Sequence, residues 1–290
     1  DKYMKKTLRV GDLLELDAPS VQHRLKVIID SKNLVLENVY NQEPLSYDEI
    51  MEWCRSQAEF FKDYICDVGT LLGAAAGQGK NILFEAQLGA LRDIDYGIYP
   101  FTSSSNTIAS YAPIGAGIPG CALDNVVGVM KAYSTCVGEG PFVAETAMGE
   151  AWNEKLRESG GEFGAATGRP RRVGPFDAVA SRYGIRCQKA QDIALTKLDV
   201  LGAFDKIPVI TGYRLHGVLL DSFPTDSRLE EAEPVIEELP GWGCDISGCR
   251  SWKDLPENAR KYVCTLEKLV DHPIYLVSTG AERDAYLLRE

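Results

Sequence analysis

The chain has 290 residues, of which 45% are hydrophobic and 25% are charged, and its formal net charge is −11. This length and composition exclude a disordered protein and are typical of a globular protein with one or two sizeable cores. The acidic balance argues against an extended nucleic-acid-binding surface, because such a surface is basic, and it favours small anionic ligands bound at a local site. No apolar run reaches the roughly 18 residues of a membrane-spanning helix.

The first 80 residues are predicted to be mainly helical. Ser20 is positioned to cap a helix that runs to about Glu37, and Ser46 with Glu49 forms a capping box for a second helix. The apolar residues that share one face of the first helix are Val21, Leu25, Ile28 and Ile29. The second helix carries a stripe, interpreted as core, that comprises Ile50, Trp53, Phe60, Phe61, Tyr64 and Ile65. The glycine-rich run 73–80 is interpreted as a turn.

Beyond this helical region, strand patterns alternate with loops and helices. Apolar and β-branched runs predict buried strands at 81–86, 125–133, 193–201, 208–215 and 274–280. Pro256 begins a helix with a clear 3.6-residue apolar period, whereas the acidic stretch 224–249 is predicted to be a solvated excursion. We therefore predict an α/β fold with a largely parallel central sheet, flanking helices and ligands at the strand ends.

Metal-ligating residue types are dispersed along the chain. The eight cysteines lack CxxC spacing, which favours reduced thiols and a cytoplasmic location over a zinc site or a disulfide framework. The histidines His23, His216 and His272 are too far apart to indicate a metal cluster. Asp93 and Asp95 are compatible with either capping or metal ligation, and we favour a structural role.

The run GEFGAATGRPRR at 161–172 indicates an anion-binding loop. Its three glycines permit sharp turns and a close backbone approach to a ligand, while Thr167, Arg169 and Arg171 supply hydroxyl and guanidinium donors. Arginine pairs bidentately with carboxylate or phosphate, so alternating arginines suit two anions on two sides of one loop. A solvated basic turn is the alternative interpretation of this run taken alone.

The run TKLD at 196–199 follows a predicted buried strand and is close to the guanine-reading NKxD pattern of GTPases. A carboxylate accepts hydrogen bonds from guanine N1–H and from its exocyclic amine, and adenine offers no such pair. Asp199 therefore predicts selection of GTP over ATP, with the stem of Lys197 on the face of the base. KLD alone is a common sequence, so this prediction depends on the other motifs.

Five motifs together resemble the adenylosuccinate synthetase family, nearly end to end and in the family's order. They are SSSN at 103–106, VGEGPF at 137–142, the loop at 161–172, TKLD at 196–199 and STG at 278–280. The resemblance implies one P-loop-NTPase-like α/β domain over residues 1–290. It also implies a homodimeric ligase of purine biosynthesis that condenses IMP with L-aspartate, using GTP and Mg²⁺.

The resemblance also assigns ligand contacts, residue by residue. The IMP-binding positions are Lys5, Ser103, Val137 and Arg169. The aspartate-binding positions are Ala165, Ala166, Thr167, Gly168 and Arg169. The GTP-binding positions are Arg171, Lys197, Leu198, Asp199, Ser278, Thr279 and Gly280. No catalytic residue and no metal ligand is assigned within the chain.

This sequence departs from the family pattern at several positions. Lys5 stands where the family has an arginine that reaches the partner subunit's IMP, and lysine lacks the guanidinium fork. Leu88 stands where the family has a glutamine that contacts the base, with Gln87 one place earlier. Either Gln87 takes this role or backbone groups do. Ala166 replaces a threonine, whereas Ser103 keeps the hydroxyl of the family's threonine.

No GxxxxGK[ST] or GDEGKGK-like phosphate loop occurs in the sequence, and the chain opens without an initiator methionine. We therefore expect an N-terminally truncated chain that resembles the C-terminal two-thirds of the family. The family's catalytic aspartate and histidine, and its Mg²⁺ ligands, would lie in the preceding segment. Negligible synthetase activity is then expected from this chain alone. The alternatives are a guanine-nucleotide-binding module without ligase chemistry and a non-catalytic interaction protein.

Overall fold

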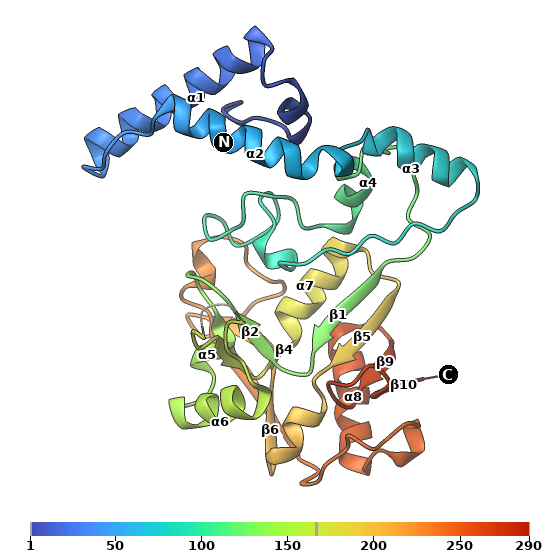
Figure 1. Ribbon diagram of the computed structural model, residues 1–290. Helices are drawn as coiled ribbons and strands as arrows, with labels where there is room; N and C mark the ends of the chain where they lie inside the picture. The colour runs from blue at the N-terminus through green and yellow to red at the C-terminus, as the bar shows by residue number, and fades with distance from the viewer. Residues whose placement is uncertain (1, 166–167, 290) are drawn as a thin grey trace. The chain divides into compact units, whose positions relative to one another are not determined.

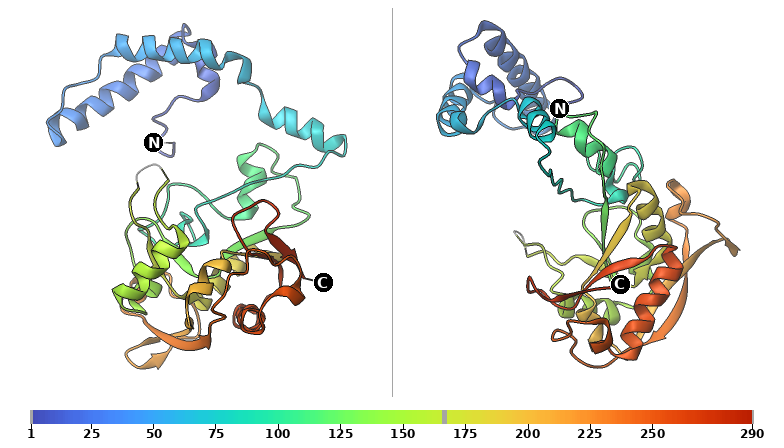
Figure 2. Two further views of the ribbon diagram at one scale, coloured as in Figure 1. Left: turned by 60° about the horizontal axis from the view of Figure 1, so that its bottom comes forward. Right: turned by 90° about the vertical axis from the view of Figure 1, so that its right-hand side faces the viewer.

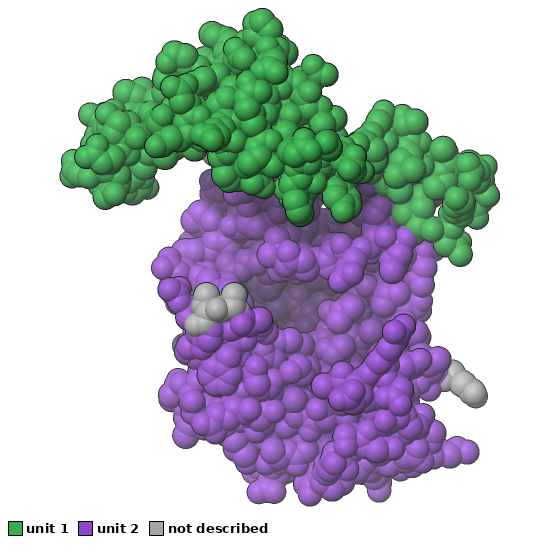
Figure 3. Space-filling model, viewed as in Figure 1, with its two compact units in different colours: residues 1–82 green, residues 83–290 purple. Residues whose placement is uncertain are grey.

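The structure is a computed structural model that describes residues 2–165 and 168–289 (Figure 1). By its internal contacts the chain divides into two compact units, residues 1–82 and residues 83–290, which Figure 3 shows in different colours. Each unit is described by itself below. Of the predicted site residues, Ala166 and Thr167 lie outside the described residues.

The first unit is helical. Its elements are η1 (Val10–Glu15), α1 (Pro19–Val39), α2 (Tyr47–Phe61), η2 (Lys62–Tyr64) and α3 (Val68–Gly77). Its small core is formed by Leu16, Val21, Leu25, Ile29, Met51 and Cys54. The apolar face predicted for the first helix is confirmed at three of these positions, and Ile28 is half-buried.

Two helix-cap predictions have different outcomes. Helix α1 begins at Pro19 with Ala18 as its N-cap, so the prediction that Ser20 caps it was wrong. Proline is favoured in the first helical turn, because its fixed φ suits the helix and its missing N–H would have no intrahelical partner there. For α2 the N-cap is confirmed, since the Ser46 side chain accepts a hydrogen bond from the backbone N–H of Glu49 at 3.4 Å, but the return hydrogen bond from Ser46 N–H to the Glu49 side chain, which a capping box requires, is not formed.

The aromatic stripe of α2 is not core. Trp53, Phe60 and Tyr64 are 60%, 68% and 78% exposed, whereas Met51 and Cys54 are buried. Both sets fit a helical period, because they lie on adjacent faces of one helix. The face with the smaller side chains is the one that packs in the core of this unit, and the sequence period alone did not distinguish the two.

Two further predictions in this region were wrong. Helix α3 extends through Gly77, so only the end of the glycine-rich run forms a turn. Residues 81–86 do not form a strand, and Leu83 is 92% exposed. A strand requires a hydrogen-bonded neighbour, and the described part of the chain supplies none for this segment.

The second unit is built on a four-stranded sheet in the order β1-β5-β9-β10. Its strands are β1 (Val127–Lys131), β5 (Asp192–Thr196), β9 (Ile274–Ser278) and β10 (Tyr286–Leu288). The first three are parallel and β10 pairs antiparallel with β9, which confirms the predicted α/β class with a largely parallel central sheet. The strands predicted at 125–133 and 274–280 are present as β1 and β9, whereas the strand predicted at 193–201 ends at Thr196, before the 3-10 helix η5 (Asp199–Ala203).

Helix α8 (Glu257–Val270) packs in the same core as this sheet, as the views in Figures 1 and 2 show. Its buried residues are Ala259, Tyr262, Val263, Leu266 and Val270, the apolar face that the sequence period predicts. Helix α7 (Ala178–Gln188) contacts α8 and leads directly into β5.

A second sheet is organised around the long strand β6. It consists of β4 (Phe176–Asp177), β6 (Lys206–Leu215), β7 (Val218–Leu219) and β8 (Glu233–Pro240). Strand β8 corrects the prediction that the acidic stretch is only a solvated excursion. It pairs antiparallel along nearly the whole of β6, and its glutamates are exposed while Val235 and Leu239 are half-buried.

The remaining elements of the second unit are short. They are η3 (Ala90–Arg92), η4 (Ala109–Tyr111), α4 (Ala112–Gly115), β2 (Ser134–Cys136), α5 (Val143–Thr146), α6 (Glu150–Gly160), β3 (Arg172–Gly174), η5 (Asp199–Ala203), η6 (Ser227–Leu229) and η7 (Trp252–Asp254). Strands β2 and β3 pair antiparallel, which brings the segment after Cys136 next to Arg172. In the described chain, no helix is both long enough and apolar enough to cross a membrane.

Candidate functional site

The predicted guanine-binding segments begin at neighbouring strand ends. In the parallel register Lys131 of β1 pairs with Thr196 of β5, and Leu195 of β5 pairs with Val277 of β9. The carboxyl ends of the three strands therefore lie along one edge of the sheet, where ligands bind in open α/β sheets. TKLD leaves β5 and STG leaves β9 at this edge.

The arginine loop is a hairpin that starts where α6 ends. Gly161 caps the helix with φ +60°, Phe163 and Pro170 form an antiparallel bridge, and the N–H of Gly164 donates to the carbonyl of Arg169 at 2.8 Å. Gly168 has φ +64°, a left-handed conformation that favours glycine. Of the residues assigned to aspartate, Ala165, Gly168 and Arg169 are exposed in this loop.

Glu162 lies beneath the loop and is only 1% exposed. Its Oε1 accepts hydrogen bonds from Lys131 Nζ at 2.8 Å and from Tyr133 Oη at 2.6 Å, and its Oε2 accepts from Arg171 Nη1 at 2.9 Å. Burial opposes ionisation of this carboxyl, but the donors from Lys131 and Tyr133 outweigh burial and lower its pKa. Glu162 is therefore a buried anion that holds Arg171 against the end of β1.

Lys197 and Asp199 occupy the turn after β5. Lys197 has φ +63°, and its Nζ donates to the carbonyl of Gly160 at 2.8 Å, so the turn is tied to the end of α6. Asp199 is half-buried, and this burial raises the pKa of its carboxyl. A carboxylate whose charge is disfavoured in this way gains from a ligand that donates hydrogen bonds to it. Leu198, between them, is fully buried.

The STG segment after β9 has a well-defined backbone. The N–H of Thr279 donates to the carbonyl of Ala285 at 2.8 Å, and its hydroxyl donates to the carbonyl of Cys249 at 3.2 Å. Ser278 Oγ donates to the carbonyl of Gly280 at 2.9 Å. Because Thr279 is fully buried, its side chain fixes the turn, and the half-buried Ser278 and Gly280 are the residues of this segment within reach of a ligand.

The residues assigned to IMP lie in the first unit and in three loops, one of which is the arginine loop with Arg169. Ser103 Oγ contacts Ser105 Oγ at 3.1 Å, and Val137 is 71% exposed. Lys5 is exposed in the first unit with φ +58°. Leu88 has φ +79° and is 50% exposed, and Gln87 is also exposed, so the alternative between these two residues stays open.

Asp93, the first of the two acidic residues before the SSSN run, orders the loop around it. Asp93 is fully buried and accepts hydrogen bonds from the backbone N–H groups of Asp95, Tyr96 and Thr107 at 2.9, 3.0 and 2.6 Å. This is a loop-ordering role, as favoured from the sequence. Among the described residues, no group of three or more His, Cys, Asp or Glu side chains could hold a metal ion.

The family model described as adenylosuccinate synthetase matches residues 1–287 of the chain. The chain belongs to the adenylosuccinate synthetase family. It is 45% and 44% identical to adenylosuccinate synthetases of Trichlorobacter lovleyi and Pelobacter propionicus, in each case over 99% of this chain and 66% of the relative. The chain thus spans 66% of the length of these curated relatives.

The solved structures agree with this assignment. The fully ligated adenylosuccinate synthetase from Plasmodium falciparum matches with a TM-score of 0.90 at 32% identity, over 100% of this chain and 68% of that chain. The adenylosuccinate synthetase fold predicted from the motifs is therefore confirmed.

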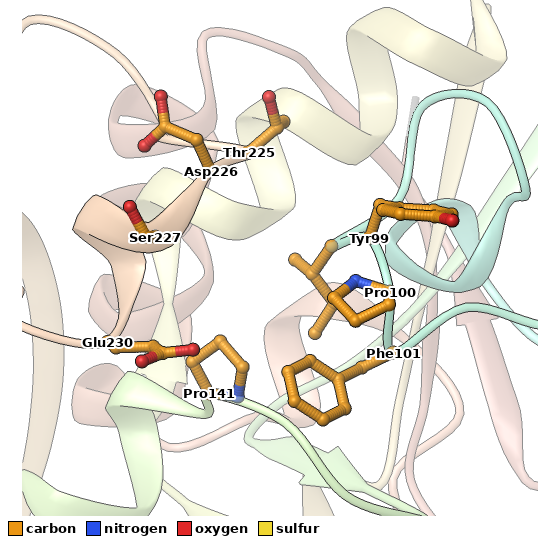
Figure 4. A pocket seen from close by; sticks show the side chains of 9 residues that line it. Tyr99, Pro100, Phe101, Pro141, Thr225, Asp226, Ser227 and Glu230 are labelled. Atoms are coloured by element: carbon orange, nitrogen blue, oxygen red, sulfur yellow. The ribbon is translucent and has the colours of Figure 1, made fainter.

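A small pocket lies apart from the residues assigned by the synthetase resemblance. It has a volume of about 120 Å³, and none of the assigned residues lines it. Figure 4 shows Pro100 and Phe101 on one side and the polar residues Asp226 and Glu230 on the other, with Pro141 next to Glu230. The candidate site of this synthetase-family chain is instead the open edge formed by the strand ends and the arginine loop.

Sequence reasoning missed Glu162, which organises this site, and Arg92, whose guanidinium donates to the carbonyls of Val137 and Glu139 in a loop assigned to IMP. Glu162 belongs to the loop motif but was not singled out, although an acidic residue before an arginine-rich run is a signal for an internal ion pair. Arg92 was not singled out at all. Its contacts are long-range, and no local pattern reveals them.

Proposed function

We propose that the chain supplies the IMP-, aspartate- and GTP-binding side of an adenylosuccinate synthetase, which condenses IMP with L-aspartate at the expense of GTP in purine biosynthesis. The observation that carries the proposal is the strand-end edge, where TKLD and STG leave adjacent parallel strands beside Arg171. The five sequence motifs and the family membership support the same assignment.

Guanine recognition is assigned to the turn after β5. The half-buried Asp199 carboxylate accepts from guanine N1–H and from the exocyclic amine, which offsets the burial that raises its pKa. The link from Lys197 to Gly160 holds the turn against the arginine loop. Ser278 and Gly280 flank the base from the neighbouring strand end.

The charges beneath the arginine loop favour anionic ligands. One carboxylate, Glu162, is shared by the cations of Lys131 and Arg171, so these cations are only partly neutralised. Arg171 is assigned to GTP, in keeping with the affinity of a guanidinium for phosphate. Residues 165–169 are assigned to aspartate, and Arg169 is assigned to IMP as well.

The reaction that the family resemblance implies has two steps. The terminal phosphoryl group of GTP passes to O6 of IMP, and the aspartate amine then displaces phosphate at C6. Such transfers depend mainly on positioning and on charge neutralisation. The assigned residues of this chain bind and orient the substrates, and none is assigned to proton transfer.

Mg²⁺ is implied by the family resemblance. The resemblance assigns none of its ligands to this chain, and among the described residues no three metal-ligating side chains come together. We assign no step to the ion.

We expect the 290-residue chain alone to bind guanine nucleotide and IMP without measurable synthetase turnover. We also propose a homodimer in which Lys5 reaches the partner subunit's IMP phosphate.

Titration calorimetry with Asp199→Asn tests the proposed guanine site. We expect the GTP affinity to fall at least tenfold, because two hydrogen bonds to a charged acceptor are weakened. Asp205→Asn, an exposed aspartate six residues later, should leave the affinity unchanged. The GTP affinity of the unaltered chain should also fall as acid protonates Asp199.

Unchanged GTP affinity in Asp199→Asn would contradict the guanine assignment. GTP binding without any IMP binding would instead favour the alternative function, a guanine-nucleotide-binding module. Binding of neither nucleotide would favour a non-catalytic interaction protein.

A further inference from the structure

Arg92 lies between the two loops that carry Ser103 and Val137. It is the last residue of η3, is half-buried, and belongs to the run LRDID. Its backbone carbonyl accepts from the N–H of Ser103 at 2.8 Å, and its guanidinium donates to the carbonyl of Phe101. Arg92 is thus fastened to the first loop by both its backbone and its side chain.

The same guanidinium reaches the second loop. Its Nη1 donates to the carbonyl of Glu139 at 3.0 Å, and its Nη2 donates to the carbonyl of Val137 at 2.9 Å and contacts Cys136 Sγ at 2.8 Å. Arginine is suited to this role because its rigid fork carries five donors. One side chain therefore joins segments that lie 45 residues apart in the sequence.

The opposite side of the second loop is held by Arg172. Its Nη1 donates to the carbonyls of Gly138 at 3.2 Å and Gly140 at 2.8 Å, while its Nε donates to Glu145 at 2.8 Å. Alternate carbonyls of the loop therefore go to opposite arginines. The Val137 side chain remains exposed between them.

The two loops also pack directly. Gly140 has φ +105°, and a Cβ at this position would come within 2.6 Å of the Phe101 side chain. Only glycine permits this approach. The packing of Gly140 on Phe101 is a second observation, independent of the hydrogen bonds, that these loops are built to hold one spacing.

We infer that Arg92 is a positioning residue that sets the spacing between the Ser103 and Val137 loops and thereby the affinity for a purine nucleoside monophosphate. The inference rests on the proposed function, in which these two loops contact IMP. Arg92 acts through the loops and is not assigned a contact with the ligand. The guanine segments after β5 and β9 are not among its partners, so its effect is confined to the monophosphate.

The test measures IMP and GTP affinities of the full chain by titration calorimetry. Arg92→Met removes every donor of the side chain at similar length, and Arg92→Lys keeps the charge without the fork. We expect Arg92→Met to weaken IMP binding at least tenfold and Arg92→Lys to weaken it by less, with GTP affinity within twofold of the unaltered chain. Arg182→Met is the control, because Arg182 is exposed and donates to the carbonyl of Leu269 in α8, away from both loops.

Hydrogen exchange of the ligand-free variants gives a second measurement that also reports whether each variant is folded. Arg92→Met and Arg92→Lys should exchange faster than the parent at both 101–106 and 137–142, and Arg182→Met should not. Faster exchange in only one loop, or IMP affinity within twofold of the parent, would overturn the inference alone. Failure of the unaltered chain to bind IMP would overturn the proposed function and this inference with it.

Discussion

The pKa values of two buried carboxylates of the second unit are shifted in opposite directions. Glu162 contacts Lys131 and Arg171, and its pKa is lowered. Asp177 is 4% exposed and accepts hydrogen bonds from the N–H groups of Val179 and Ala180 at the start of α7 and from the Tyr213 hydroxyl, and burial raises its pKa to about 6. Nearby cations therefore lower the pKa of a carboxyl in spite of burial, whereas neutral donors only reduce the rise in pKa that burial causes.

The two environments also predict different roles. Asp177 caps α7 and joins it to β6, so its role is structural. Glu162 leaves its cations incompletely neutralised at the strand-end edge, where we place anionic ligands. Variants at and around the two carboxylates distinguish these roles.

Replacement of Glu162 should have the largest effect on stability. Glu162→Leu leaves Lys131 and Arg171 without their shared carboxylate, so we expect the free energy of unfolding to fall by about 3 kcal/mol or more. Urea denaturation measures this loss. The control is Glu158→Leu in the last turn of α6, four residues before Glu162. Its side chain is exposed, so the free energy of unfolding should change by no more than about 0.5 kcal/mol. Equal losses in the two variants would contradict the ion-pair interpretation.

The Asp177 carboxyl should make stability depend on pH in the direction opposite to Glu162. Its folded pKa is about 6 and its ordinary value is 3.8, so the folded state binds the proton more tightly and this group's contribution increases as the pH falls through 6. The contribution of Glu162 is retained until the pH falls toward its lowered pKa. Between pH 7 and pH 5 we expect the parent to gain about 1 kcal/mol relative to Asp177→Asn.

Denaturation of both proteins at the two pH values checks this prediction. The amide in Asp177→Asn keeps the size of the side chain and one acceptor oxygen but has no titration in this range. A constant difference between parent and variant from pH 7 to pH 5 would show that Asp177 titrates in the folded protein as it does when unfolded.

Gly160 should give the smallest of these effects. A Cβ at this position would lie 2.5 Å from Tyr133 Oη, so Gly160→Ala displaces the hydroxyl that donates to Glu162. We expect a net loss of about 0.5 kcal/mol, since overpacking and a lost hydrogen bond are partly offset by the better helix propensity of alanine. Gly73→Ala, inside helix α3, has open space around the new methyl group and serves as the control. Calorimetric melting temperatures compare the two, and a Gly160→Ala protein as stable as its control would argue against a close Tyr133 contact.

Local sequence patterns determined the class of the fold and the location of the candidate site. The strands that lead to Asp199 and to Ser278 were predictable because buried parallel strands are apolar and their turns are polar. The helix after Pro256 was predictable because one face alone must be apolar. The motif order was sufficient to indicate the synthetase family before any tertiary contact was known.

Tertiary structure decided which side chains act together. The stripe with Trp53 and the face with Met51 have the same period, and only packing within the first unit selected between them. The segment 81–86 has a strand pattern, but a strand forms only where another strand lies beside it. Glu162 meets Lys131 across 31 residues, and Arg92 meets Val137 across 45. Such contacts depend on the path of the whole chain, and for that reason no local pattern contains them.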